Sequence, residues 1–130
     1  MADDGQRKGG EVRRLRERRG RSVETRAAIA LRLKGYRVLA SRVRTPAGEV
    51  DLVVRRGSVV AFVEVKARKT RERAADSISP TQRRRIVRAA AHYIAANPGL
   101  ANLTQRFDAV LVEPRRWPHH IISAWTESGD

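Results

Sequence analysis

The segment GEVDLVVRRGSVVAFVEVKA, residues 48–67, decides the fold because it contains two strands joined by a tight turn. Gly57-Ser58 is a strong signal for a two-residue hairpin turn, and the runs on either side are rich in β-branched residues. With the turn centred on this dipeptide, the strands pair so that Asp51 lies opposite Glu64. The segment therefore predicts an antiparallel hairpin with two carboxylates facing each other.

Side chains alternate along a strand, so the hairpin has one charged face and one apolar face. The charged face carries Glu49, Asp51, Glu64 and Lys66, with Glu49 opposite Lys66. The other face carries the expected core residues Val50, Leu52, Val54, Val63 and Val65. We expect the charged face to hold a functional site and the apolar face to pack inside the protein.

The sequence pattern leaves two interpretations of the charged face open. An acid and a lysine two residues apart, such as Glu64 and Lys66, often lie only on the solvated face of a sheet. However, residues 59–67 are otherwise almost wholly apolar, which is typical of a central strand buried on both faces. Opposed carboxylates repel by up to about 1 kcal/mol in an exposed sheet, and burial adds to that cost. A divalent metal bridging Asp51 and Glu64 would neutralise them, and their hard oxygen ligands suit Mg²⁺ or Mn²⁺.

The remaining patterns predict a helix, three strands, a second helix and two strands. The expected elements are a helix over 22–34, strands over 36–43, 49–55 and 59–67, a loop over 68–77, a helix to about residue 96, and strands over 106–112 and 120–126. Ser79 is placed to cap the second helix, with Pro80 in its first turn and Gln82 completing a capping box.

In the first helix, Ser22 is the expected N-cap, and Ala27, Ala28 and Leu31 form one apolar stripe. Glu24 lies on the same stripe. An acid at this position either stabilises the positive end of the helix dipole or points into a site.

Composition limits the class of protein. The 130 residues carry 28 Lys and Arg against 14 Asp and Glu, a net charge of +14, which favours a polyanionic partner. The chain has no cysteine, so disulfides, thiolate zinc sites and cysteine nucleophiles are excluded. We expect no secretory signal and no membrane span, and hence a cytoplasmic protein. Residues 1–21 are expected to form a flexible basic arm, either a solvated tail or a phosphate-binding segment, and residues 22–127 a single domain.

The element order and four segments, RTPAGEVDLVV, AFVEVKAR, ISPTQRRRIVRAAAHYI and RFDAVLVE, resemble the YraN-like family of uncharacterised bacterial proteins. The resemblance extends from about Arg19 to Trp125. More widely, the layout is similar to the PD-(D/E)XK nuclease superfamily, including archaeal Holliday-junction resolvases. The resemblance implies a restriction-endonuclease-like, three-layer α/β fold. Its central mixed β-sheet is flanked by helices in the order α-β-β-β-α-β-β.

The resemblance also implies roles for individual residues. Asp51 and Glu64, with the main-chain carbonyl of Val65, would bind Mg²⁺ or Mn²⁺. Lys66 would orient or deprotonate the attacking water and stabilise charge on the scissile phosphate. Glu24 would add a ligand or a supporting contact. Glu49 would do the same or merely pair with Lys66.

Gln82 departs from the family pattern, in which a lysine often stands at this position. A glutamine would position water or phosphate but brings no charge. The alternative role for Gln82 is the capping box itself.

Arginines and one lysine are expected to contact nucleic-acid phosphates around the site. They are Arg68, Lys69, Arg71 and Arg73 after the third strand, and Arg83, Arg84 and Arg88 on the second helix. Such contacts give affinity without sequence specificity and weaken steeply with salt. Arg106 and Asp108 lie on one strand face and are expected to form a structural ion pair, whereas the adjacent His119 and His120 point to opposite faces.

Three functional hypotheses follow. The first is a metal-dependent endonuclease acting on DNA, with branched or structured DNA as its substrate. The second is a catalytically quiet nucleic-acid-binding protein on a nuclease-like fold, and the third is a basic accessory factor that binds another protein. Analogy with junction resolvases also suggests a homodimer.

Overall fold

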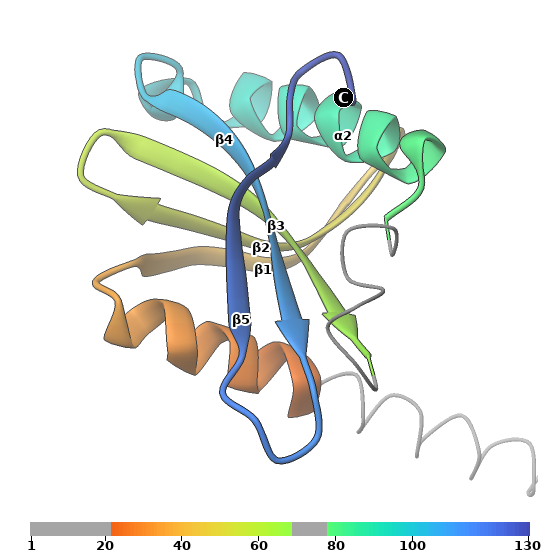
Figure 1. The fold of residues 1–130 in the computed structure, drawn as a ribbon. Coiled ribbons are helices and arrows are strands. Elements are labelled where there is room, and N and C mark those ends of the chain that lie inside the picture. The colour runs from red at the N-terminus through yellow and green to blue at the C-terminus, as the bar shows by residue number, and fades with distance from the viewer. Residues whose placement is uncertain (1–21, 69–77) are drawn as a thin grey trace, which may run out of the picture.

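The computed structural model describes residues 22–68 and 78–130, which form an α/β fold. A five-stranded mixed sheet has one helix on each face (Figure 1). The elements are a first helix of residues 22–33, β1 Arg37–Thr45, β2 Gly48–Arg56, β3 Val59–Ala67, α2 Pro80–Ala96, the short 3-10 helix η2 Pro98–Leu100, β4 Thr104–Val112 and β5 His119–Trp125. The predicted α/β class and the order α-β-β-β-α-β-β are confirmed. The expected arm, residues 1–21, and residues 69–77 of the expected loop lie outside the described residues.

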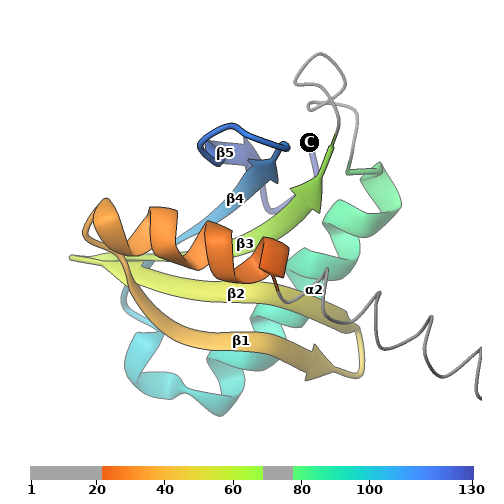
Figure 2. The ribbon, with the colours of Figure 1, turned by 90° about the horizontal axis from the view of Figure 1, so that it is seen from below.

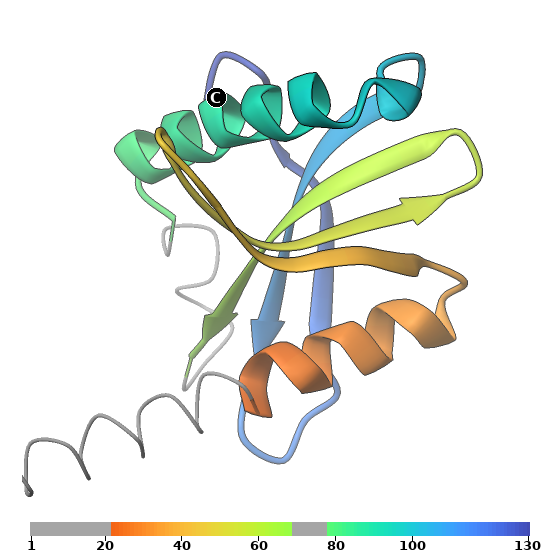
Figure 3. The same ribbon diagram turned by 180° about the vertical axis from the view of Figure 1, so that it is seen from behind.

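The strands follow one another across the sheet in the order β1-β2-β3-β4-β5. Neighbours are antiparallel except β3 and β4, which are parallel. Parallel neighbours need a crossover connection, and α2 supplies it on one face of the sheet (Figure 3). In this order β3 is the central strand of the sheet, as its apolar sequence predicted.

The predicted hairpin register is confirmed. The β2–β3 pairs run from Arg56 opposite Val59 to Leu52 opposite Val63. Gly57 closes the turn with a φ of 59°, a left-handed conformation that glycine adopts without steric cost. The same register, continued by one residue, places Asp51 opposite Glu64.

Each face of the sheet packs its own core. Ala27 and Leu31 of the first helix pack against one face, and Ile86 and Ala89 of α2 pack against the other. Figure 2 shows the first helix lying along the sheet, with α2 on the far side. Both faces of β3 are therefore buried, and Phe62 is fully enclosed.

The expectation that Val50 shares a face with Leu52 is wrong. Leu52 packs on the side of the first helix, whereas Val50 packs with Val53 on the α2 side. Side-chain alternation along β2 therefore changes at Asp51. In β1, Arg42 lies between the residues paired with Leu52 and Val50, and its φ of 51° departs from extended geometry.

Candidate active site

Asp51 and Glu64 lie together where β2 and β3 begin to separate. The last β2–β3 pair before them joins Leu52 to Val63. Beyond it, Asp51 Oδ2 accepts a hydrogen bond from the backbone N–H of Val65 at 2.8 Å. A side-chain carboxylate thus takes a position that a backbone carbonyl would occupy in a continuous ladder. Asp51 is held rigidly beside β3 as a result.

Both carboxyl groups have raised pKa values. Burial is the largest cause for each, and it leaves Glu64 only 6% exposed. The pKa of Glu64 rises to about 7 because the negative charge of Asp51 adds to burial and outweighs Lys66. For Asp51, the Val65 N–H lowers the pKa less than burial raises it, and the charge of Glu24 raises it further. The positive charge of Lys66 therefore does not fully compensate the two carboxylates, and this favours the binding of a cation.

Two donors converge on a single oxygen of Glu64. Lys66 Nζ lies 3.2 Å from Glu64 Oε1, and the side-chain amide of Gln82 donates to the same atom at 2.9 Å. Lys66 comes from β3 itself, whereas Gln82 comes from the first turn of α2. These contacts bring Lys66 and Gln82 to the carboxylate pair.

Gln82 also takes part in the helix cap. The Ser79 hydroxyl accepts a hydrogen bond from the Gln82 backbone N–H at 3.1 Å, so Ser79 caps α2 as predicted. The Gln82 side chain is directed to Glu64. The two interpretations of Gln82 are thus compatible, since its backbone serves the cap and its side chain reaches the site.

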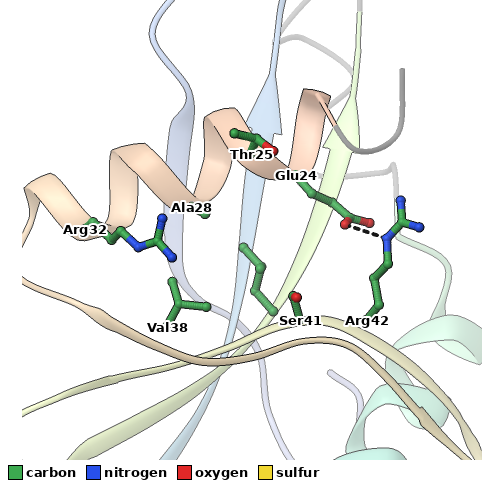
Figure 4. A pocket seen from close by; sticks show the side chains of 8 residues that line it. Glu24, Thr25, Ala28, Arg32, Val38, Ser41 and Arg42 are labelled. Carbon is green, nitrogen blue, oxygen red and sulfur yellow. Dashed lines mark hydrogen bonds and ion pairs between the residues drawn. The ribbon is translucent and has the colours of Figure 1, made fainter. Parts of the chain in front are cut away.

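Glu24 faces the same cavity from the first helix. This cavity of about 350 Å³ is lined by Val23, Glu24, Asp51, Glu64, Val65, Lys66 and Ala67. Glu24 Oε2 accepts a hydrogen bond from Arg42 Nε at 2.9 Å, and the two side chains form an ion pair. Figure 4 shows them meeting between the first helix and β1. Glu24 therefore points into the site region, where Arg42 neutralises it. No sequence signal singled out Arg42, because its contact with Glu24 is tertiary.

Glu49 is not brought to the cavity. It was expected on the same face as Asp51 and opposite Lys66. Its side chain is instead 62% exposed and pairs with Arg44 at 3.1 Å across the β1–β2 ladder. The change of alternation at Asp51 turns Glu49 away from the other acids.

The donor set suits a hard divalent cation that keeps part of its water shell. Within residues 22–68 and 78–130, no three acidic or histidine side chains converge closely enough to hold a metal by themselves. Mg²⁺ commonly binds through one or two carboxylates and completes its shell with water and substrate phosphate. Asp51 and Glu64 fit that mode, with the Val65 carbonyl as a further oxygen donor beside them.

The predicted basic residues lie on α2, directly after β3, and outside the described residues. Arg84 and Arg88 are exposed on α2. Arg83 is half-buried and, contrary to the expectation, does not project freely. Arg68 follows β3, and its backbone N–H bonds to the Val112 carbonyl. The others, Lys69, Arg71 and Arg73, lie outside the described residues.

Arg106 and Asp108 form the expected structural ion pair. Two Arg106 nitrogens reach the two Asp108 oxygens at 2.9 and 2.8 Å, and Asp108 is fully buried. His120 Nε2 lies 2.8 Å from Asp108 Oδ2, while His119 is exposed on the other face. This cluster lies on the sheet face of the first helix and is separate from the Asp51–Glu64 pair.

Comparison with known proteins identifies the family. The model of an uncharacterised protein family, UPF0102, matches residues 23–112. A UPF0102 protein of Parvibaculum lavamentivorans is 56% identical over 108 residues, covering 83% of this chain and 81% of the relative. One from Methylobacterium nodulans is 55% identical over 113 residues, covering 87% and 88%. In the part of the chain that the structure describes, no helix is long and apolar enough to cross a membrane. The match covers both strands of the Asp51–Glu64 hairpin and all of α2, and the chain belongs to the uncharacterised protein family UPF0102.

Proposed function

We propose that this protein is a metal-dependent endonuclease that hydrolyses phosphodiester bonds in DNA. The observation that carries the proposal is the pair of half-buried Asp51 and buried Glu64, with Lys66 Nζ lying 3.2 Å from Glu64 Oε1. Two acids brought together with one of them buried destabilise the fold unless they serve a function, even with a lysine beside them. Its chemistry matches the needs of phosphate-ester hydrolysis, in which negative charge develops on the phosphate.

Each side chain has a distinct task in this proposal. Mg²⁺ or Mn²⁺ held by Asp51, Glu64 and the Val65 carbonyl would polarise the phosphate and supply hydroxide. Lys66 would orient the attacking water and offset negative charge on the scissile phosphate. Gln82 would hold Glu64 from the first turn of α2 and orient water or phosphate through its amide. Because Asp51 is held by the Val65 N–H, its position would change little when substrate binds.

The layout favours branched or structured DNA as substrate. The resemblance to PD-(D/E)XK nucleases, and among them to junction resolvases, supports this choice. A four-way junction needs two symmetric cuts, so such a function calls for a homodimer. The net charge of +14 supports binding to the phosphate backbone.

A second candidate function is nucleic-acid binding without cleavage. Two features favour it: Gln82 brings no charge where a lysine often stands in the family, and Glu24 is already neutralised by Arg42. This alternative predicts binding that weakens with salt and is indifferent to divalent ions.

A cleavage assay separates the two candidates. The full chain is incubated with Mn²⁺ and linear, flapped, single-stranded and four-way-junction DNA, together with Glu64→Gln and Glu49→Gln. Glu49→Gln is a matched control because it removes an acid next to the site that does not line the cavity. We expect the wild type and Glu49→Gln to cleave and Glu64→Gln to bind without cleaving. Salt-sensitive binding with no cleavage of any substrate would favour the quiet binding protein.

A further inference from the structure

We infer that a pocket of three arginines, at the far end of the first helix from Asp51 and Glu64, binds a backbone phosphate of the nucleic acid. This arginine pocket has a volume of about 420 Å³ and is lined by Gly35, Arg37, Arg55, Arg56 and Gly57. The chemical class of the ligand rests on the proposed function. The pocket deepens that function by adding a second point of contact with the substrate.

The register of the sheet forces two of these arginines together. Arg37 of β1 and Arg55 of β2 are directly opposed partners in the antiparallel ladder. Like charges at opposed positions destabilise a sheet. Within residues 22–68 and 78–130, no acidic side chain pairs with either of them. An anion bound between the two guanidinium groups would remove the repulsion.

The protein already orients two of the three guanidinium groups. Arg55 Nε donates to the Gly57 carbonyl at 3.1 Å, and the Arg56 guanidinium lies over the Tyr36 ring at 5.6 Å from its centroid. Tyr36 is itself buried, so this support is rigid. Arginines held in place lose less entropy on binding and suit the planar, paired contacts that phosphate accepts. Gly35 and Gly57 add no side chains to the pocket.

The first helix runs from the cavity of Asp51 and Glu64 to the arginine pocket, so its length gives the distance between the two sites. Glu24 lies near its start, and Gly35 follows its end, so the helix of residues 22–33 spans about 18 Å between them. A larger cavity of about 490 Å³ runs between this helix and β1, and it is lined by both Arg32 and Arg42 (Figure 4). Glu24 borders that cavity and the acid site alike.

A ligand that touches both ends must therefore be extended. At about 3.4 Å of rise per nucleotide, 18 Å corresponds to roughly five nucleotides along one strand. A nucleotide or a free phosphate cannot bridge the acids and the arginine pocket. A continuous nucleic-acid backbone can.

The experiment measures binding rather than cleavage. Fluorescence anisotropy with a labelled duplex of about 20 base pairs, longer than the span to be bridged, is recorded in EDTA over a series of salt concentrations. The test variant of the full chain is Arg37→Gln/Arg55→Gln. The control, Arg44→Gln/Arg115→Gln, removes the same charge from two exposed positions outside the pocket.

We expect the test variant to bind about tenfold more weakly and the slope of log K against log salt to fall by about 1, since the pocket holds one phosphate and each lost phosphate contact removes about 0.9. The control should keep the wild-type slope. Equal losses in the two variants would show that only total charge matters, and would overturn the pocket. An unchanged slope in the test variant would overturn it as well.

Stability is measured on the same samples. Because repulsion between Arg37 and Arg55 is removed, the test variant should melt at the wild-type temperature or above it. If it does not fold, Arg56→Gln takes its place, and the slope should then fall by about 1.

The binding assay is independent of the nuclease proposal because EDTA removes divalent ions. Loss of binding in the test variant, together with no cleavage by the wild type, would keep the pocket and refute the nuclease. Cleavage by a wild type whose binding ignores Arg37 and Arg55 would do the reverse.

Discussion

The side-chain amide of Gln82 lies 2.9 Å from Glu64 Oε1, the same oxygen that Lys66 Nζ approaches at 3.2 Å. This contact joins the first turn of α2 to the central strand. Gln82 contributes a neutral donor, and the pKa of Glu64 stays raised because burial and the charge of Asp51 outweigh Lys66. The site is therefore held together by hydrogen bonds but remains short of positive charge.

Gln82→Ala should lower the free energy of unfolding by about 1–2 kcal/mol, because it removes a donor from a buried carboxylate. Urea denaturation at pH 7 measures the change. Thr81→Ala is the matched control, since Thr81 is the exposed neighbour in the same helical turn and should change stability by less than about 0.5 kcal/mol. Equal stability of the two variants would mean that the Gln82 contact contributes nothing to folding.

The raised pKa of Glu64 predicts that stability falls as pH rises when no divalent ion is present. The folded pKa is about 7, against 4.5 for an ordinary glutamate, so the folded state binds the proton more tightly than the unfolded state. This contribution is fully present below about pH 4.5 and is lost as pH rises through about 7, at a cost of up to about 3 kcal/mol. Denaturation between pH 4.5 and 8 in EDTA measures it. Glu64→Gln should flatten this part of the profile, and a wild type that gains stability over the same range would contradict the prediction.

Divalent ions should reverse that loss of stability. Mn²⁺ or Mg²⁺ at 100 times its dissociation constant would add about 2.7 kcal/mol to the folded state at pH 8. The increase should disappear in Asp51→Asn and in Glu64→Gln and persist in Glu49→Gln, whose side chain lies outside the cavity. Differential scanning calorimetry with and without the metal measures it. An equal increase in all four proteins would locate the metal elsewhere.

The hairpin and its two facing acids were predictable because they depend on local rules. The Gly57-Ser58 turn sets the register, and the register alone brings Asp51 and Glu64 together. The apolar residues around Glu64 correctly indicated a strand buried on both faces. The Ser79 cap was likewise predictable from one short motif.

The direction of Glu49, the Gln82–Glu64 bond and the arginine pocket could not be predicted, because they depend on tertiary structure. A positive φ at Arg42 carries no sequence signal in a non-glycine residue, yet the alternation that decides where Glu49 points changes opposite it. The Gln82–Glu64 bond depends on how α2 crosses the sheet. The pairing of Arg37 with Arg55 depends on a register shift between Val38 and Ala40 in β1, which the loosely alternating sequence does not reveal.

Asp108 differs from Glu64, because hydrogen-bond donors around it stabilise its negative charge. Burial raises its pKa, but hydrogen bonds from His120, Arg106 and the Ser123 N–H outweigh burial and hold the pKa below its usual value. Its contribution to stability is therefore present above the ordinary aspartate pKa of 3.8 and is lost as pH falls through the lowered folded value. Asp108→Ala should lower the free energy of unfolding at pH 7 by about 3–5 kcal/mol, because Arg106 is left without its bidentate partner.

Urea denaturation of Asp108→Ala, Asp108→Asn and Glu127→Ala tests this prediction. Asp108→Asn keeps the shape and some of the hydrogen bonds, so it should lose less than Asp108→Ala. Glu127 is exposed, and its removal should cost less than about 0.5 kcal/mol. If Asp108→Ala were as stable as Glu127→Ala, the ion pair would have no structural role. Arg106 and Asp108 would then have to be considered part of a functional site, separate from Asp51 and Glu64.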